Sequence, residues 1–363
     1  MIKKFDYILL VILSVSFLIF DISAQEAPGN TLPNKQKHEE IDVQSLILEH
    51  LADAYEWHLF TIKDKAITIP LPIIVYSKEH GFKMYSSSDI ETEHTLYDDI
   101  PYYISQEGEY KGKVVYRVGE DEKRPLDLSL TKNATSILIS SFLLVLIIVG
   151  ISRNYEGESF EGKKGFNGGM EFLIESLMND VIRPSIGKKY KRYAPYVLTL
   201  FFFIFFNNFL GLIPFFPGGA NVTGNISVTL VLAVFTFLII NLTGSKSYYK
   251  DLFWPDVPMF LKAPFPLMQI IELVGTITKP FALMIRLFAN ITAGHSIMLG
   301  LTSLVFVTVS LGSGINAGMT VVSVLFNIFI FFLEFLVAFI QAYIFTVLTS
   351  VFIGLARNPE PAK

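Results

Sequence analysis

Three basic side chains interrupt an apolar stretch near the carboxyl end of the chain. Lys279, Arg286 and His295 lie within residues 265–310, and Arg286 is close to the middle of that stretch. An ionisable side chain at bilayer depth costs at least about 2.5 kcal/mol on insertion scales, so it indicates an ion pathway or a charged partner. Lys279 is explained equally well by snorkelling, in which a long side chain near a helix end reaches back to the membrane interface, as by a functional role. Snorkelling does not explain Arg286, which we interpret as a buried, functional cation at mid-membrane.

Other polar residues repeat at helical spacing around these three. Intervals of seven and four residues place one set on a single helix face: Glu272, Lys279, Arg286 and Asn290. A second set recurs every seven residues in the next apolar block: Asn327, Glu334 and Gln341. His295 is about 180° round the helix from Arg286 and about 13 Å farther along it. If the helices run antiparallel with Arg286 level with Gln341, the carboxylate of Glu334 falls near the same level as that imidazole.

This arrangement predicts a fixed charge beside a proton-exchanging pair. Arginine stays protonated in proteins, so Arg286 can act only as a fixed cation. A histidine and a buried glutamate both exchange protons near neutral pH, which makes His295 and Glu334 candidates for a relay. A proton path that ends at an arginine crosses only part of the membrane, because the arginine cannot pass the proton on. We therefore expect a moving partner with an anionic carboxylate to continue it.

The composition is that of a polytopic membrane protein. The chain of 363 residues is 52% hydrophobic with 33 phenylalanines, and its mean hydropathy is +0.48. Several stretches are apolar on every face, as membrane-spanning helices are. The absence of cysteine excludes disulfides, thiolate metal sites and a cysteine nucleophile. Charge is segregated, because residues 25–132 carry 12 Lys and Arg against 20 Asp and Glu, whereas residues 133–363 carry 15 against 11.

The amino-terminal third is predicted to be exported. Residues 1–24 combine two early lysines with an apolar core at 8–20 and small residues after it, which is typical of a signal peptide. An uncleaved first transmembrane helix is the alternative. Residues 25–132 are predicted to form a small, mainly β, periplasmic domain, with a weak helical pattern at 41–60. Its strands are expected at 66–76, 82–85 and 113–118. Its five histidines are scattered, so we expect no metal site.

Residues 133–363 are predicted to form an all-α polytopic membrane domain. Five stretches are long enough to cross a bilayer at 1.5 Å per residue: 134–152, 195–216, 226–243, 265–311 and 319–355. The last two are long enough to be tilted helices, joined by a loop at 312–318. Residues 170–186 have the pattern of an interfacial helix. Basic residues gather in the loops at 153–193 and 244–264 and in the tail, which predicts a cytoplasmic C-terminus and a periplasmic amino-terminal domain.

At its polar residues the sequence resembles subunit a of the rotary F-type ATP synthase, the stator of the proton-conducting membrane sector. The match covers about residues 165–357. Its most specific motifs are Arg-Leu-Phe-Ala-Asn at 286–290, Ala-Gly at 293–294 and Gln-Ala-Tyr-Ile-Phe at 341–345. The resemblance says nothing about the role of residues 25–132.

The resemblance implies roles for single residues. Arg286 is implied to be the stator arginine that faces the carboxylate of the rotating c-ring, with Asn290 and Gln341 as polar partners. His295 and Glu334 fall on two outer half-channel positions, which hold glutamate then histidine in some members and the reverse, as here, in others. Two residues fall on a possible inner-side channel: Glu272 and Lys279.

The chain also departs from the family pattern. Asn225 and Ser227 stand where an Asp and an Asn are usual, and Gly211 replaces a residue that is often polar. The histidine and glutamate could also form a structural ion pair that only braces their helices. In that case the outer path must run through the Asn225 loop or through Asn207 and Asn208.

The resemblance implies a non-enzymatic subunit that forms two half-channels against the c-ring and couples proton flow to ring rotation and ATP synthesis. Its expected partners are the c-ring, peripheral-stalk subunit b, the other ATP synthase subunits and the lipids of a bacterial inner membrane, without nucleic acid, cofactor or metal. A secondary ion transporter or an ion channel is the alternative, although a transporter's inverted repeats are not found. An intramembrane metalloprotease is excluded by the lack of an H-E-x-x-H cluster. The choice between H⁺ and Na⁺ belongs to the ring and stays open.

Overall fold

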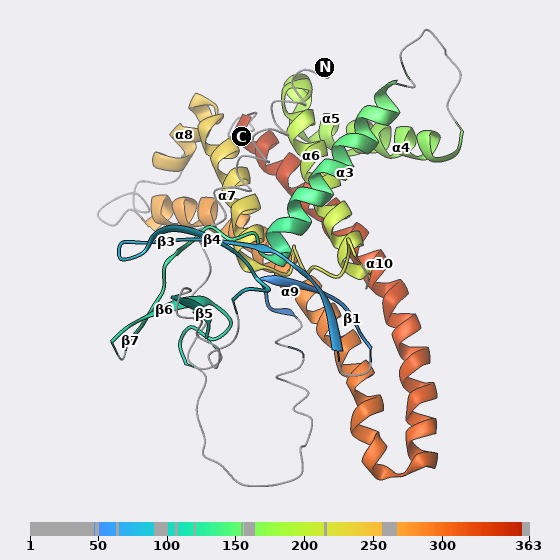
Figure 1. Ribbon diagram of the computed structural model, residues 1–363. Helices are drawn as coiled ribbons and strands as arrows, with labels where there is room; N and C mark the ends of the chain where they lie inside the picture. Colours follow the sequence, from blue (N-terminus) through green and yellow to red (C-terminus); the bar gives the residue numbers. More distant parts are fainter. Residues whose placement is uncertain are drawn as a thin grey trace.

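The chain folds into a β-rich amino-terminal domain and a bundle of helices (Figure 1). The computed structural model describes residues 47, 51–62, 65–90, 101–105, 108–119, 121–153, 155, 164–213, 216–255 and 267–357. The predicted signal peptide lies outside these residues and stays a prediction.

Three small antiparallel sheets make up the amino-terminal domain. The first pairs β1 (Glu56–Ile62) with β2 (Lys65–Pro70). The second has the order β4 (Gly81–Ser86), β3 (Pro72–Ser77), β8 (Leu126–Asp127). The third has the order β5 (Tyr102–Ile104), β6 (Val114–Val118), β7 (Asp121–Lys123). The predicted strands are confirmed, and the run at 66–76 is divided into β2 and β3.

The helical pattern predicted at 41–60 is wrong for its last part, which is strand β1. Trp57 is buried while its neighbours Glu56 and His58 are exposed. This alternation is the side-chain period of a strand. Pairing with β2 therefore decides the conformation where the helical period in the sequence is weak.

The domain has its own apolar core between the second and third sheets. Its buried members are Tyr55, Ile73, Val75, Ile90, Tyr102, Val114 and Tyr116. The hydroxyl of Tyr55 donates to the carboxylate of Asp127. Burial, together with the neighbouring charge of Asp127, raises the pKa of this hydroxyl and keeps it a donor. The bond fixes β8 to the core just before the chain enters the helical bundle.

The helices follow in chain order: α3 (Lys132–Arg153), α4 (Gly165–Ser176), α5 (Arg183–Ile186), α6 (Tyr190–Leu212), α7 (Ile226–Leu242), α8 (Lys246–Phe253), α9 (Leu267–Val307) and α10 (Ser313–Arg357). A π-helical segment at Leu177–Ile182 joins α4 to α5, so the helix predicted at 170–186 is helical throughout. Among the described residues four helical segments are long and apolar enough to cross a membrane, and a fifth if α7 and α8, bent by 102°, form one span. The upper count equals the five crossings predicted.

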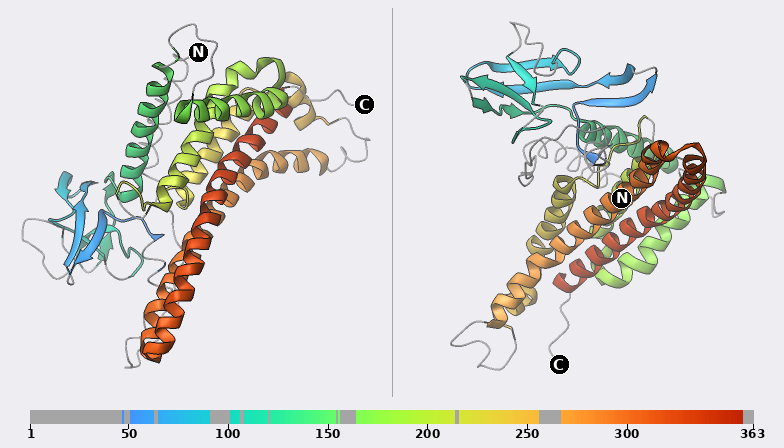
Figure 2. Two further views of the ribbon diagram at one scale, coloured as in Figure 1. Left: turned by 90° about the vertical axis from the view of Figure 1, so that its right-hand side faces the viewer. Right: turned by 90° about the horizontal axis from the view of Figure 1, so that it is seen from below.

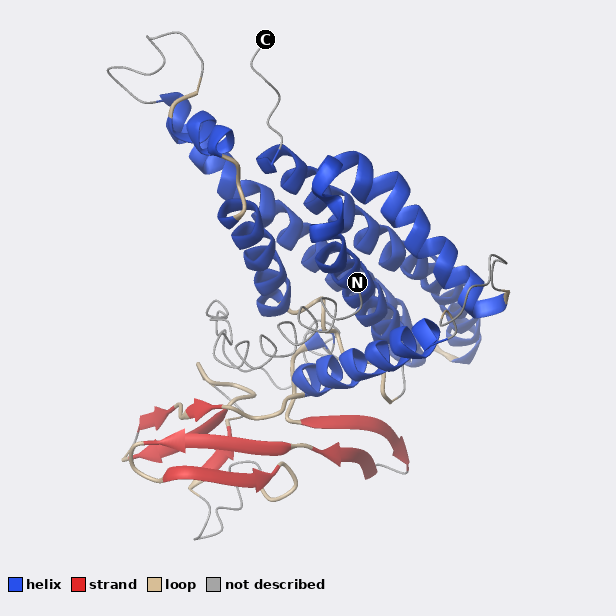
Figure 3. Ribbon diagram, turned by 90° about the horizontal axis from the view of Figure 1, so that it is seen from above, coloured by secondary structure: helices blue, strands red, loops and turns tan. Residues whose placement is uncertain are grey.

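Helix α6 is the centre of the bundle. It packs against α3 and α10, while α9 packs against α7 and α10 (Figure 2). The strands of the amino-terminal domain lie together on one side of the helices (Figure 3). The middle of α6 is almost entirely buried, and the side chains of Phe201 and Ile204 have no exposed surface. Helix α10 approaches α5 closely at Gly354, where an added Cβ would lie 2.0 Å from the carbonyl oxygen of Ser185. Only glycine allows this contact.

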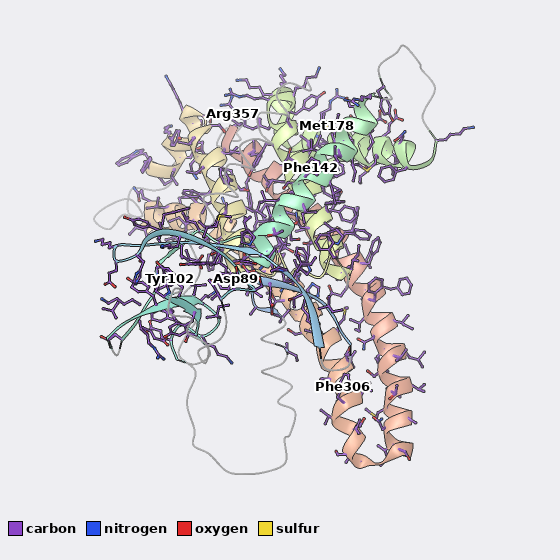
Figure 4. All side chains as sticks on the ribbon, viewed as in Figure 1. Asp89, Tyr102, Phe142, Met178, Phe306 and Arg357 are labelled. Carbon is purple, nitrogen blue, oxygen red and sulfur yellow. The ribbon has the colours of Figure 1, made fainter. Side chains whose placement is uncertain are left out.

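Helices α9 and α10 form a long antiparallel hairpin that projects beyond the other helices (Figures 1 and 2). The loop predicted at 312–318 is wrong, because α10 already begins at Ser313. Gly312 adopts a φ of 103° and makes the turn alone, and its carbonyl accepts the N–H of Asn316 at 3.0 Å. The hairpin exposes large apolar side chains such as Phe306 (Figure 4) and Phe332, which is 68% exposed. Such a surface suits contact with lipid.

Candidate functional site

The polar face of α9 is exposed around Arg286. Arg286 and Asn290 are exposed, as is Lys279 two turns earlier. On the other face Leu283 and Leu287 are 2% and 1% exposed and belong to the bundle core. Arg286 is therefore not covered by other described residues of this chain, and its burial at mid-membrane stays a prediction. The helical period that buries the two leucines also turns the arginine outward.

Arg286 has no partner in the part of the chain that the structure describes. No hydrogen bond, ion pair or cation–π contact joins its guanidinium to another described residue. A cation on a membrane-spanning helix is tolerated where a charged or polar group meets it. This face of α9 is therefore open to a partner from outside the described residues.

The polar stripe of α10 faces inward. Glu334 is 5% exposed and Gln341 6% exposed. Farther toward the hairpin turn, the amide of Asn327 donates to the hydroxyl of Thr302 on α9 at 3.2 Å. The predicted stripe thus lies against other parts of the chain, which is the opposite of the arrangement at Arg286.

Glu334 and His295 converge on the same short segment of α9. Oε1 of Glu334 lies 1.1 Å from the position that a Cβ on Gly294 would occupy, so the carboxylate fills the space left by the missing side chain. Nε2 of His295, the next residue, lies 3.6 Å from the corresponding Cβ position of Gly211 at the end of α6. Oε2 of Glu334 is buried without a hydrogen-bond partner among the described residues. The carboxylate and the imidazole therefore lie at similar levels along α9, as the spacing in the sequence predicted.

Neutral polar groups tie the surrounding helices together. The amide of Asn208 donates to the carbonyl of Ala338, one turn from Glu334, at 3.2 Å. Its oxygen accepts the hydroxyl of Thr223 at 2.5 Å. These bonds hold α6, the loop after it and α10 in register without adding charge.

A second neutral contact lies between α3 and α6. The hydroxyl of Ser140 donates to the amide oxygen of Asn207 at 2.9 Å, and both side chains are buried. Sequence reasoning named the asparagine only as an alternative route and missed the serine. A signal was available, because Asn133, Ser136 and Ser140 recur on one face of an otherwise apolar helix.

The loop before α7 has a structural role. The side chain of Asn225 accepts the backbone N–H of Ser227 at 2.9 Å and caps α7. A cap satisfies one of the free N–H groups at the start of a helix. The residues that depart from the family pattern here therefore support the local fold.

The two residues assigned to the inner side lie near the start of α9. Lys279 places its ammonium 5.9 Å from the ring centroid of Phe352 on α10, which is cation–π geometry. Glu272 is half-buried, and its backbone carbonyl accepts the hydroxyl of Thr276 at 3.0 Å. Within the described ranges no three His, Asp or Glu side chains gather as a metal site.

The helical bundle thus exposes the cations Lys279 and Arg286 on α9 and buries the carboxylate of Glu334 against Gly294, the residue before His295. Residues 134–354 match the model of the family described as ATP synthase A chain. Residues 46–134 match a domain of unknown function (DUF8433).

Curated relatives agree with the first match. The chain is 45% identical over 240 residues to "ATP synthase subunit a 2" of Chlorobaculum tepidum, covering 63% of this chain and 64% of that protein. It is 43% identical over 240 residues to "ATP synthase subunit a" of Chlorobium phaeobacteroides, covering 64% and 67%. The match thus spans less than two thirds of the length of the first of these relatives. The chain belongs to the ATP synthase A chain family.

The first prediction concerns the space on Gly294. Gly294→Ala forces the carboxylate of Glu334 to move, because the new Cβ and Oε1 cannot both be accommodated. Overpacking a filled site costs about 1 to 3 kcal/mol, so the thermal midpoint of the purified protein should fall. Gly275→Ala is the matched control on the same helix, since nothing lies within 4 Å of its Cβ position. Equal midpoints for the two variants would contradict the described packing.

Proposed function

We propose that the chain is the proton-translocating stator subunit of a rotary ATP synthase. In this function it forms two half-channels against a ring of small subunits and couples proton flow to rotation of the ring and to ATP synthesis. The observation that carries the proposal is Arg286, which is exposed on α9 and has no partner among the described residues. Membership of the ATP synthase A chain family supports it.

The role of Arg286 follows from its charge and its position. An arginine cannot deliver a proton, so it separates the two half-channels as an electrostatic barrier. Its attraction for anions favours the deprotonated form of a carboxylate that passes it on the ring. We propose two polar partners for Arg286 in the assembled complex. One is Asn290, which is exposed four residues later on the same face, and the other is Gln341 on α10.

His295 and Glu334 are the proposed relay of the outer half-channel. Their shared level on α9 and the unpartnered Oε2 of Glu334 support this role. Proton transfer requires groups within hydrogen-bond reach, directly or through one water. Glu272 and Lys279 are proposed for the inner side, near the opposite end of α9.

The proposed setting is the inner membrane of a bacterium. The c-ring, peripheral-stalk subunit b and the remaining ATP synthase subunits are the proposed partners, and other subunits carry the catalysis of ATP formation. The excess of Lys and Arg in alternate loops supports a cytoplasmic C-terminus and a periplasmic amino-terminal domain.

The test of the central role is Arg286→Ala in the assembled complex. ATP-driven proton pumping should be abolished and passive proton leak should increase, because the barrier between the half-channels is lost. Arg286→Lys should also fail, since the ammonium lacks the planar fork of the guanidinium. Arg153→Ala, at the exposed end of α3, is the control and should pump normally. Pumping by Arg286→Ala at the wild-type rate would refute the proposed function.

The relay predicts the result of an exchange of its two members. His295→Glu and Glu334→His should each slow proton flux as single variants, whereas the double exchange should restore appreciable conductance. A relay depends on having one imidazole and one carboxylate within reach and depends less on which helix supplies each. Passive proton conductance of membranes with normal subunit content measures this. If the single variants assemble and conduct like wild type, the pair is structural.

Orientation has its own test. Protease added to the outer face of spheroplasts should remove residues 25–132 and spare the basic loop at 153–193. Antibodies to each segment can follow the cleavage. Cleavage of the amino-terminal domain only in inverted vesicles would reverse the orientation of every crossing.

A further inference from the structure

The amino-terminal domain joins the first long helix without a flexible linker. The N–H of Lys132 donates to the carbonyl of Ala54 at 2.8 Å, and the N–H of Asn133 donates to the carboxylate of Asp53 at 3.0 Å. These N–H groups belong to the first turn of α3, where backbone N–H groups have no hydrogen-bond acceptor within the helix. Asp53, 80 positions earlier in the chain, thus accepts a hydrogen bond from the start of α3, and this bond fixes the domain to the helix.

A second contact is made by Trp57 of β1. Its side chain is only 2% exposed because it enters the buried cluster of the helical bundle. Its ring lies 5.1 Å from that of Phe216 with an angle of 70° between the planes, which is a favourable edge-to-face pair. Phe216 lies in the loop between α6 and α7. In addition, Cδ1 of Ile47 lies 4.0 Å from the position that a Cβ on Gly300 of α9 would occupy.

The loop that Trp57 contacts folds back over the end of α6. The N–H of Gly219 donates to the carbonyl of Leu210 at 3.3 Å. An added Cβ on Gly218 would lie 2.4 Å from the carbonyl oxygen of Ile213, so the loop can approach the helix end only with glycine at this position. The path of this loop is therefore closely fitted to α6.

The same loop lies against the glycine that the imidazole of the proposed relay also approaches. The carbonyl oxygen of Ala220 lies 3.3 Å from the Cβ position of Gly211, and Nε2 of His295 lies 3.6 Å from that position. The loop and the imidazole thus pack against the same glycine. Trp57 touches this loop at Phe216, four residues before Ala220.

We propose that the amino-terminal domain is a positioning element for the outer half-channel. By holding the loop between α6 and α7 through Trp57, it fixes the packing around Gly211 and with it the position of the His295 imidazole. The role rests on the proposed function of His295. The proposal gives a role to residues 46–134, which match a domain of unknown function.

The experiment compares Trp57→Ala with Phe82→Ala in the full complex. Phe82 is an aromatic of the same domain, 63% exposed on β4, and is the matched control. We expect the amide of Gly219 to exchange about 2- to 10-fold faster in Trp57→Ala, which corresponds to the loss of one aromatic pair. ATP-driven proton pumping should fall in the same variant. Phe82→Ala should change neither quantity, and Trp57→Phe should retain most of both.

The same effects should appear from the other side of the contact. Phe216→Ala should reproduce Trp57→Ala, and the double variant should be no worse than either, because both remove one interaction. If Trp57→Ala does not assemble, Phe216→Ala provides the test, since this side chain is already 44% exposed.

Two results would overturn the proposal. Unchanged exchange at Gly219 means that Trp57 does not hold the loop. If the amide of Gly219 exchanges faster in Trp57→Ala but proton pumping stays at the wild-type rate, the loop does not position the relay. The exchange measurement does not depend on proton transport, so its outcome is separate from that of Arg286→Ala, which tests the proposed function.

Discussion

The structure depends on how a membrane protein accommodates ionisable groups where water is absent. Each such group must be matched by a partner or lie in a space shaped for it. The chain uses both solutions on neighbouring helices. α9 turns Arg286 outward to a surface where another molecule can meet it, while α10 buries Glu334 against the bare backbone of Gly294. The first arrangement leaves the cation open to an external partner, and the second holds a carboxylate inside the chain.

Neutral hydrogen bonds and glycines provide the frame for these two sites. Asn208 links α6 to α10 and to the following loop, and Ser140 links α3 to Asn207. Such bonds fix helices in an apolar medium without the cost of further charge. Gly211 and Gly294 leave room beside the imidazole and the carboxylate respectively, so the packing around these two groups is set as much by missing side chains as by present ones.

Much of the helical fold and of the site could be predicted from periodicity. The apolar runs gave the helices, and intervals of seven residues placed Glu334 near the level of His295 before any contact was known. Features set by tertiary contact could not be predicted. The outward direction of Arg286 depends on which face of α9 is covered by α7 and α10. The formation of β1 depends on its pairing with β2. The role of Gly294 depends on the side chain of Glu334, 40 residues later in the chain. The one-residue turn at Gly312 was missed because the polar, glycine-rich sequence after it favours a loop.

The most direct measurement is a cross-link from the exposed face of α9. The chain has no cysteine, so a benzophenone carried by Asn290→Cys, one turn from Arg286, reports only its own surroundings. We expect this probe to cross-link to a small membrane subunit with a carboxylate at bilayer depth. The same probe at Phe142→Cys, exposed on α3 (Figure 4), should not. Cross-links from position 290 to lipid alone, in a complex that pumps protons when unlabelled, would contradict the claim that Arg286 faces a moving partner.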